Sequence, residues 1–497
     1  MKKIYLLAVA LIAGVIIIAS CADDAPINNG QNQAGGGAYA PTDGEPEQAA
    51  PEHTIFDVLP ERNFDGMTFT VYVPPNPDSP VDKGTFAEEL TGDIFNDAIF
   101  HRNRRVEEQY NVRIAAVYGA NWDSAVGDLR TDVRAGELRA DVYFTHVFAG
   151  VAAKVSEGLL RTWDAVPHLD FEQPWWNSTI IENLNIANRM FYIAGAMSIQ
   201  EPLVMLFNKD MILDLHLENP YTLVREGRWT VDKLSEMARA AARDLNGDGI
   251  MSPEHDQFGL EFGMSWQTPA LMYASNLISV TLDDNGFPHI DLLGERHVRA
   301  FERISEMLWD ESMTFLYGGD TVEANNIPFM GIDSGRVLFV QWNLFNVHRL
   351  RATEIDYGIL PLPKLDESQE RYLSVSWTGM YGLPAIIDDG RLEMIGIVME
   401  SMSALGYTDV IPVYYDIVLK EKFARDEDSR EMLDIILNNM VFDLGLNFQT
   451  GASHPGFFTA ALFRQRGSNY VSSVERQIDR MMADYDRLFQ TVLELDN

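Results

Sequence analysis

The sequence predicts an α/β fold that is divided into two lobes. Segments with the pattern of strands alternate with segments with the pattern of helices, which is typical of parallel or mixed sheets with helices on both faces. The chain has 497 residues, of which 46% are hydrophobic. A single hydrophobic core seldom exceeds about 250–300 residues, so we expect more than one.

The first half of the folded body, which we expect to begin near Asp65, carries the clearest alternation. Met67–Val73 reads M-T-F-T-V-Y-V, the period-two pattern of a half-buried strand. The elements expected after it are a helix over 93–110, a strand over 112–117, a helix over 128–136 and a strand over 140–144.

Helical patterns dominate the second half. Thr230 is a plausible N-cap for a helix over 230–243, and the apolar residues of that helix form one stripe: Val231, Leu234, Met237, Ala238 and Ala241. Residues 298–308 and 431–440 have similar patterns. The run over 471–495 predicts one long amphipathic helix.

The N-terminus has the layout of an export signal with a lipoprotein cleavage site. Lys2 and Lys3 precede the uncharged run Leu6–Ile18, and Ala19-Ser20-Cys21 follows directly. Cys21 is the single cysteine of the chain. A transmembrane anchor is the alternative, but Ile4–Ser20, about 17 residues, is at the lower limit for a bilayer span. We therefore expect residues 1–20 to be a signal peptide and Cys21 to carry lipid at the outer face of the cell membrane.

Residues 22–52 are rich in Ala, Gly, Asn, Gln and Pro and contain almost no large apolar side chains. Such a segment cannot bury enough surface to order itself. As a flexible coil it would reach roughly 30 Å on average. We expect residues 21–64 to be the lipidated cysteine and a tether.

The charge of the chain excludes some partners. Its 38 basic and 74 acidic residues give a net charge of −36, and removing Lys2 and Lys3 with the signal makes it −38. A charge this negative repels nucleic acid and anionic lipid headgroups. The lipid on Cys21 would therefore be the contact with the membrane.

Residues 244–256 contain the most specific motif of the body. Asp244, Asn246 and Asp248 occupy positions 1, 3 and 5 of a calcium-loop pattern, and Gly249 occupies position 6. Ile250 would add a backbone carbonyl. Position 12 is His255, a poor calcium ligand, so the candidate closing residue is Asp256. We expect a structural calcium ion here; the alternative is an ordinary Asn/Asp/Gly turn.

No catalytic motif is recognisable. The sequence lacks G-x-S-x-G, H-E-x-x-H, a Walker loop and a Rossmann glycine run after a strand. The expectation is a protein that is not an enzyme, although a glycosidase carboxylate pair could hide among its acidic residues. Aromatic side chains beside turns suit a small-molecule site, although each could equally be a core residue: Trp175, Trp176, Trp266, Trp342 and Trp377.

Several segments, taken in order, resemble the family 1 extracellular solute-binding proteins of ABC transporters, the family of maltose-binding protein. The resemblance is carried by G-R-W-T-V-D-K-L at 227–234, F-M-G-I-D-S-G-R at 329–336 with the strand to Trp342, and D-Y-G-I-L-P-L-P-K at 356–364. Motifs typical of a clostridial subgroup add to it: 91–93, 102–103, 106–107, 174–176, 414–415 and 425–429. The resemblance covers about residues 65–445.

This resemblance implies a two-lobed periplasmic-binding-protein-like fold with a hinge and an interlobe cleft. It implies an N-terminal lobe from 65–200 and 360–400 and a C-terminal lobe from 201–359 and 401–497. Glu201 falls where maltose-binding protein has a cleft glutamate, and Trp342 falls where it has a stacking tryptophan. Trp377 would face the same cleft, with Trp175, Trp176 and Trp266 as weaker candidates.

The function that the resemblance implies is capture of a carbohydrate, expected to be an oligosaccharide, by a monomer that delivers it to the permease subunits of an ABC importer. A peptide ligand would also suit an aromatic cleft. Two other functions stay open: a surface lipoprotein glycoside hydrolase, and a solute sensor that feeds a signalling receptor.

Overall fold

The computed structural model describes residues 54–73, 84–121, 124–146, 149–264, 267–283, 286–317, 332, 335–344, 347, 350, 353–376, 379–415, 426–448, 453–466 and 469–495. All of them belong to one compact unit, Gly35–Asn497. The signal sequence, Cys21, Trp266 and Trp377 lie outside the described residues.

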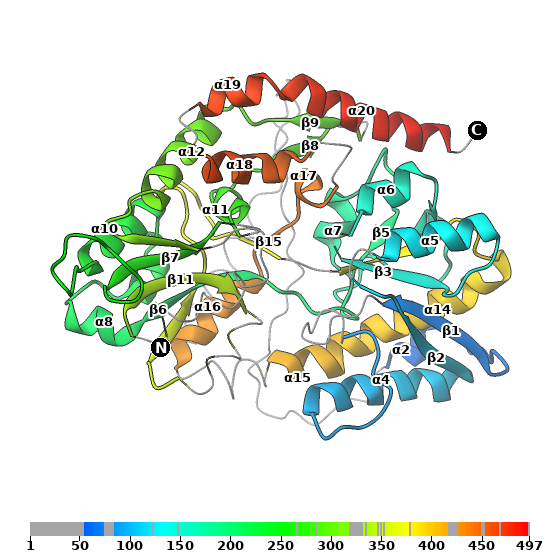
Figure 1. Cartoon of the computed structure of the whole chain (residues 1–497). Coiled ribbons are helices and arrows are strands. Elements are labelled where there is room, and N and C mark those ends of the chain that lie inside the picture. Colours follow the sequence, from blue (N-terminus) through cyan, green and yellow to red (C-terminus); the bar gives the residue numbers. More distant parts are fainter. Residues whose placement is uncertain are drawn as a thin grey trace, which may run out of the picture. The chain divides into compact units, whose positions relative to one another are not determined.

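Two mixed sheets organise the described residues (Figure 1). The first has the order β2-β1-β3-β14-β4, with β5 also paired to β14. Its strands are β1 (Met67–Val73), β2 (Val112–Tyr118), β3 (Val142–His146), β4 (Leu160–Arg161), β5 (Tyr192–Ile193) and β14 (Gly379–Pro384).

The second sheet has the order β10-β7-β11-β6-β12. Its strands are β6 (Leu203–Asn208), β7 (Phe258–Gly263), β10 (Thr314–Tyr317), β11 (Val337–Asn343) and β12 (Tyr357–Leu360). Two small sheets pair β13 (Ser374–Val375) with β15 (Met440–Val441), and β8 (Val280–Leu282) with β9 (Pro288–Ile290).

Helices lie on both faces of the first sheet. In β1, Val71 packs in one core with α4 (Ile94–Tyr110) and α14 (Leu392–Leu405), whereas Tyr72 packs in another with α5 (Ser124–Ala135) and α6 (Val151–Ser156). This alternation follows from the period of two in a strand. The expectation of helices on both faces is confirmed.

On the second sheet, α10 (Val231–Ala241) lies against β7. A Cβ atom on Gly259 would lie 1.9 Å from the carbonyl oxygen of Ala238, so the glycine permits the close approach of helix and strand. The helices around the two sheets include α7 (Ser178–Asn183), α8 (Lys209–Asp214), α9 (Pro220–Arg225), α11 (Pro269–Ala274), α12 (Glu295–Leu308), α15 (Ile411–Tyr415) and α16 (Glu427–Leu437).

The C-terminal region forms α17 (Leu444–Asn447), α18 (Pro455–Arg464), α19 (Tyr470–Glu475) and α20 (Ile478–Glu494). The prediction of one long helix over 471–495 was wrong. The helix is interrupted at Gln477, whose N–H donates to the carbonyl of Val474. Packing explains the break: the ring of Tyr470 stacks at 4.4 Å on Phe301 of α12, whereas Phe489 of α20 stacks on Phe287 beside β9.

Other boundaries agree closely with the sequence patterns. β1 has the expected bounds, and Thr230 caps α10 by accepting a hydrogen bond from the N–H of Lys233. β3 lies two residues later than expected, and α16 begins four residues earlier, where Asp426 is its N-cap. Residues 54–64, placed in the tether from sequence, include the short helix α2 (Ile55–Val58). They pack partly on the core that contains Val71, α4 and α14, which we call the first core.

Among the described residues, one continuous helical run, Asp389–Tyr415, is long and apolar enough to cross a membrane. Of the most apolar 18-residue stretch of this run, 83% is buried inside the protein, as in the core helix of a globular protein.

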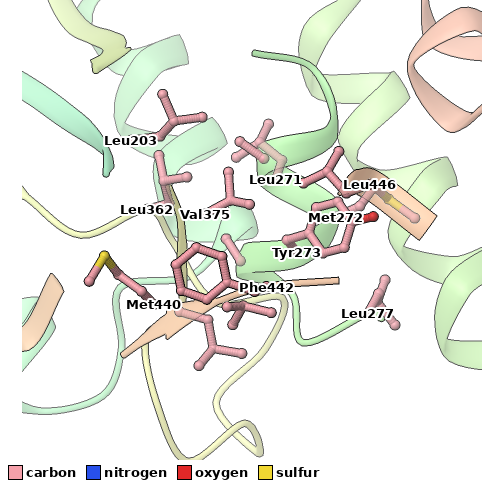
Figure 2. Close-up of a cluster of buried hydrophobic side chains, with 14 of the residues drawn as sticks. Leu203, Leu271, Met272, Tyr273, Leu277, Leu362, Val375, Met440, Phe442 and Leu446 are labelled. Carbon is pink, nitrogen blue, oxygen red and sulfur yellow. The ribbon is translucent and has the colours of Figure 1, made fainter. Parts of the chain in front are cut away.

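Figure 2 shows an apolar cluster in which strands of different sheets meet the C-terminal region. Leu203 begins β6, Leu362 and Val375 come from the segment between β12 and β14, and Met440 and Phe442 come from the region of β15. This cluster packs the segments that pass between the two sheets against the rest of the protein.

Candidate functional site

The carboxyl ends of three parallel strands lie along one side of the first sheet, which we call its carboxyl edge. β1 pairs in parallel with β2 and β3, and these strands end at Val73, Tyr118 and His146. β14 is antiparallel to β3 and begins with Gly379 opposite His146. In open α/β sheets, ligands bind outside the carboxyl ends of the strands.

The second sheet presents an equivalent edge. β7, β10 and β11 are mutually parallel and end at Gly263, Tyr317 and Asn343. β6 is antiparallel to β11 and begins with Leu203 opposite Asn343. The start of β6 therefore lies at the carboxyl edge of the second sheet.

Two segments that pass between the sheets meet at these edges. Residues 194–202 connect β5 to β6, and the return from β12 to β14 begins with residues 361–376. Pro202 and Ser376 form an antiparallel bridge. The Ser376 hydroxyl accepts the N–H of Glu201 at 3.0 Å and donates to the Gln200 side chain at 3.2 Å. We call residues 194–202 and 361–376 the crossing segments.

Glu201 lies on the first crossing segment and is buried. Its negative charge acts on Tyr414 of α15, whose pKa is raised first by burial and then by Glu201. Tyr414 is buried and packs on Phe95 of α4 at 5.3 Å between ring centroids. Sequence reasoning did not select Tyr414 as a site residue, because nothing in its local pattern separates it from a core tyrosine.

Trp342 is the penultimate residue of β11 and is also buried. Its ring centroid is 6.2 Å from that of Tyr317, which ends β10, a parallel strand of the same sheet that is separated from β11 by β7. Trp342 and Tyr414 belong to the same apolar cluster, and Trp175 packs against that cluster. The structure thus brings Trp342 and Trp175 into one cluster with an aromatic neighbour of Glu201.

Trp175 and Trp176 share a buried acidic partner. Each indole N–H donates to a different oxygen of Glu400 at 2.9 Å, and the backbone N–H of Asp170 donates to the same carboxylate at 3.2 Å. Burial raises the pKa of Glu400 to about 7, although these hydrogen bonds act in the opposite direction. Trp176 is buried in the first core, and Trp175 lies between that core and the cluster of Trp342. Both indole N–H groups are therefore used within the protein.

The loop after α10 is folded by its own side chains. Both oxygens of Asp244 accept backbone N–H groups, from Gly247 and Gly249, and both oxygens of Asp256 accept others, from Leu245 and Ser252. The side chain of Asn246 donates to Asp248 at 2.9 Å, and the N–H of Ile250 donates to the same carboxylate at 2.8 Å. These contacts close the loop by hydrogen bonds alone.

The described residues contain no group of three His, Cys, Asp or Glu side chains placed to hold a metal ion. The carboxylate oxygens of Asp244, Asp248 and Asp256 accept N–H groups within the loop. The calcium site stays a prediction.

Two cavities elsewhere in the described part of the chain are alternative candidates for a ligand site. One of about 540 Å³ lies between α10 and α12, and another of about 580 Å³ lies between α4 and the outer strand β2. Ligand pockets of proteins have such volumes. The first, however, is lined largely by charged side chains, among which Arg303 pairs with Asp232 at 3.1 Å. It lacks the aromatic lining that is typical of pockets for small molecules.

Solved structures share this arrangement over most of the chain. An ABC substrate-binding protein from Listeria monocytogenes, in complex with cycloalternan, has 11% identity and a TM-score of 0.52, and the match covers 84% of this chain and 98% of that one. A cyclo/maltodextrin-binding protein complexed with maltotetraose has 13% identity, a TM-score of 0.52, and coverages of 85% and 96%. The chain has the fold of two-lobed ABC substrate-binding proteins. The sequence-based prediction of the fold is confirmed.

UgpB from Mycobacterium tuberculosis, in complex with glycerophosphocholine, is similar to the same extent, with 12% identity, a TM-score of 0.53, and coverages of 85% and 99%. No protein-family model matches the sequence, and no curated protein matches it significantly. In this fold, the two sheets are the centres of the two lobes and the crossing segments connect them.

Proposed function

We propose that this protein is the solute-binding component of an ABC importer and that it captures a carbohydrate, in the first place an oligosaccharide. The solute lies where the crossing segments meet the carboxyl edges of the two sheets. It is held by aromatic stacking and by hydrogen bonds to Glu201. The two lobes close around it and present a surface to the permease.

The observation that carries this proposal is the placement of Glu201 and Trp342. They lie far apart in sequence, one on a crossing segment and one at the end of β11, and both lie at the carboxyl edge of the second sheet. A carboxylate beside aromatic rings suits a sugar, because the carboxylate accepts bonds from hydroxyl groups and the rings cover the apolar faces. The complexes of similar structures with cycloalternan and maltotetraose support this class of ligand.

A thermal-shift screen of the exported chain tests the proposal. The panel contains maltotetraose, cycloalternan, glycerophosphocholine and a set of short peptides. A ligand that binds the native state raises its apparent stability by about 2.7 kcal/mol at a hundredfold excess over Kd. We expect the sugars to raise the melting temperature. A shift with the peptides or with glycerophosphocholine alone would reject the carbohydrate.

The same samples test the enzymatic alternative. A glycoside hydrolase would shorten maltotetraose during incubation, and chromatography of the sugar would reveal this. We expect the sugar to stay intact. A sensor would bind the sugar equally well, so transport is tested separately, by uptake of labelled sugar in cells with and without the protein.

The membrane attachment that we propose depends on Cys21. A lipid on this residue would hold the protein near its permease and raise its effective concentration there. Cys21→Ser should release the protein from the membrane fraction. A variant that stays membrane-bound like the wild type would identify residues 4–20 as a transmembrane anchor.

A further inference from the structure

The hydroxyl group of Tyr414 is buried without a hydrogen-bond partner among the described residues. Tyr414 itself is 4% exposed, and its ring packs on Phe95 and on Tyr415 at 5.3 and 5.8 Å between centroids. Buried polar groups are nearly always paired, because a buried hydroxyl group that loses its hydrogen bonds to water without gaining others lowers the stability of the protein. This unpaired hydroxyl group therefore needs a reason.

The surroundings of Tyr414 supply one. Two observations place it beside the proposed site: it belongs to the same apolar cluster as Trp342, and Glu201, after burial, raises the pKa of its hydroxyl group. Phe95, one of its two ring neighbours, lies in the first turn of α4, a helix that packs against the first sheet. Tyr414 thus stands where elements of both sheets and the first crossing segment come together.

We propose that Tyr414 is a solute-binding residue whose hydroxyl group donates a hydrogen bond to the solute, on the same side of the site as Glu201. A sugar hydroxyl group both donates and accepts. Glu201 offers an acceptor and Tyr414 a donor, so together they can satisfy adjacent hydroxyl groups of one sugar ring. This inference rests on the proposed function and adds to it a residue from α15.

A tyrosine hydroxyl group that binds the solute and one that stabilises the fold respond differently to removal. Removing an unpaired hydroxyl group leaves stability unchanged or higher, since no bond is lost in the free protein. Removing a paired one lowers stability. Tyr221 of α9 is the matched control, because it is equally buried and its hydroxyl group is bonded to Ser429 at 2.9 Å.

The experiment compares Tyr414→Phe and Tyr221→Phe with the wild type by thermal melting and by titration calorimetry with maltotetraose and cycloalternan. We expect Tyr414→Phe to melt no lower than the wild type and to bind about tenfold more weakly. We expect Tyr221→Phe to melt about 1–2 °C lower, as the loss of one hydrogen bond in a large protein predicts, with unchanged affinity.

Three outcomes would overturn the inference, and they are distinguishable. If Tyr414→Phe melts lower, as the control does, the hydroxyl group has a structural role. If its affinity is unchanged, Tyr414 does not touch the solute, and the proposed function stands without it. If neither sugar binds the wild type, the carbohydrate function itself fails and the inference fails with it.

Discussion

The crossing segments have two sides that are built differently. On one side, Leu362 and Val375 lie in the apolar cluster of Figure 2, together with Leu203 of β6 and Phe442. On the other, Ser376, the residue after Val375, accepts the N–H of Glu201. Successive residues of an extended chain point in opposite directions, so one short stretch serves both a packed core and a polar site.

The comparison separates what holds the two lobes together from what would hold a solute. The apolar side can be fixed by packing alone. Near the polar side lies Tyr414 of α15, whose hydroxyl group has no hydrogen-bond partner among the described residues. Substitutions on the first side should therefore change stability, and substitutions on the second side should change affinity.

The largest effect is expected in the apolar cluster. Phe442 is 2% exposed, and truncating a buried phenylalanine costs about 3–5 kcal/mol because it leaves a cavity. Phe442→Ala should lower the free energy of unfolding in urea by this amount and leave the affinity of the folded protein unchanged. Tyr118→Ala, at a site that is 59% exposed, is the control and should change stability by less than about 0.5 kcal/mol. Equal effects of the two variants would contradict the packed role of the cluster.

The next effect concerns Glu400, which links Trp175 to the first core. Its folded pKa of about 7 is above its ordinary value, so the native state favours the protonated form. The associated stability is fully present below about pH 4.5 and is lost as the pH rises through 7. At one pKa unit per 1.36 kcal/mol, the loss is about 3 kcal/mol.

Glu400→Gln removes this titration. The difference in unfolding free energy between wild type and variant should shift by about 2.5 kcal/mol in favour of the variant between pH 5 and pH 8. Urea denaturation at both values measures the shift. A difference that is independent of pH would mean that Glu400 has an ordinary pKa in the folded protein.

A smaller effect is expected at the aromatic residues of the site. Truncating an anchor residue usually costs about 2 kcal/mol or more, roughly thirtyfold in affinity. Trp342→Ala and Trp377→Ala should each weaken maltotetraose binding to this extent in calorimetry, with folding checked by circular dichroism. If both folded variants bind as the wild type does, these tryptophans are core residues.

The smallest effect is expected at the loop of Asp244 and Asp248. If calcium binds there at about ten times its Kd, chelation should remove about 1.4 kcal/mol of stability. Asp248→Ala should abolish the effect of the chelator on the melting curve. Superimposable wild-type curves with and without chelator would leave a turn that hydrogen bonds alone hold closed.

The sequence was most informative where local patterns decide the structure. Thr230 and the stripe that follows it predicted α10, and the alternation in Met67–Val73 predicted β1. Local patterns could not reveal the break at Gln477, because the separate packing of Tyr470 and Phe489 on distant elements causes it.

The site was harder to predict than the fold. Glu201 and Trp342 were predicted as site residues through a family resemblance, and the strand register places Trp342 and the start of β6, two residues after Glu201, at one sheet edge. Trp175 and Trp176 both donate hydrogen bonds to Glu400, which lies more than 220 positions further along the chain. No local sequence pattern predicts such a contact. Tyr414, which we propose as a solute-binding residue, gave no local signal either, because an unpaired hydroxyl group is visible only in three dimensions.

The central claim is that the solute lies where the crossing segments meet the two sheet edges. Hydrogen exchange measured by mass spectrometry, with and without saturating maltotetraose, tests it directly, because a bound solute slows the opening of the backbone that it contacts. We predict slower exchange in peptides that cover 194–202, 339–344 and 407–415, and no change in α10 and α12. Protection confined to the cavity between α10 and α12, with none in the crossing segments, would contradict the account.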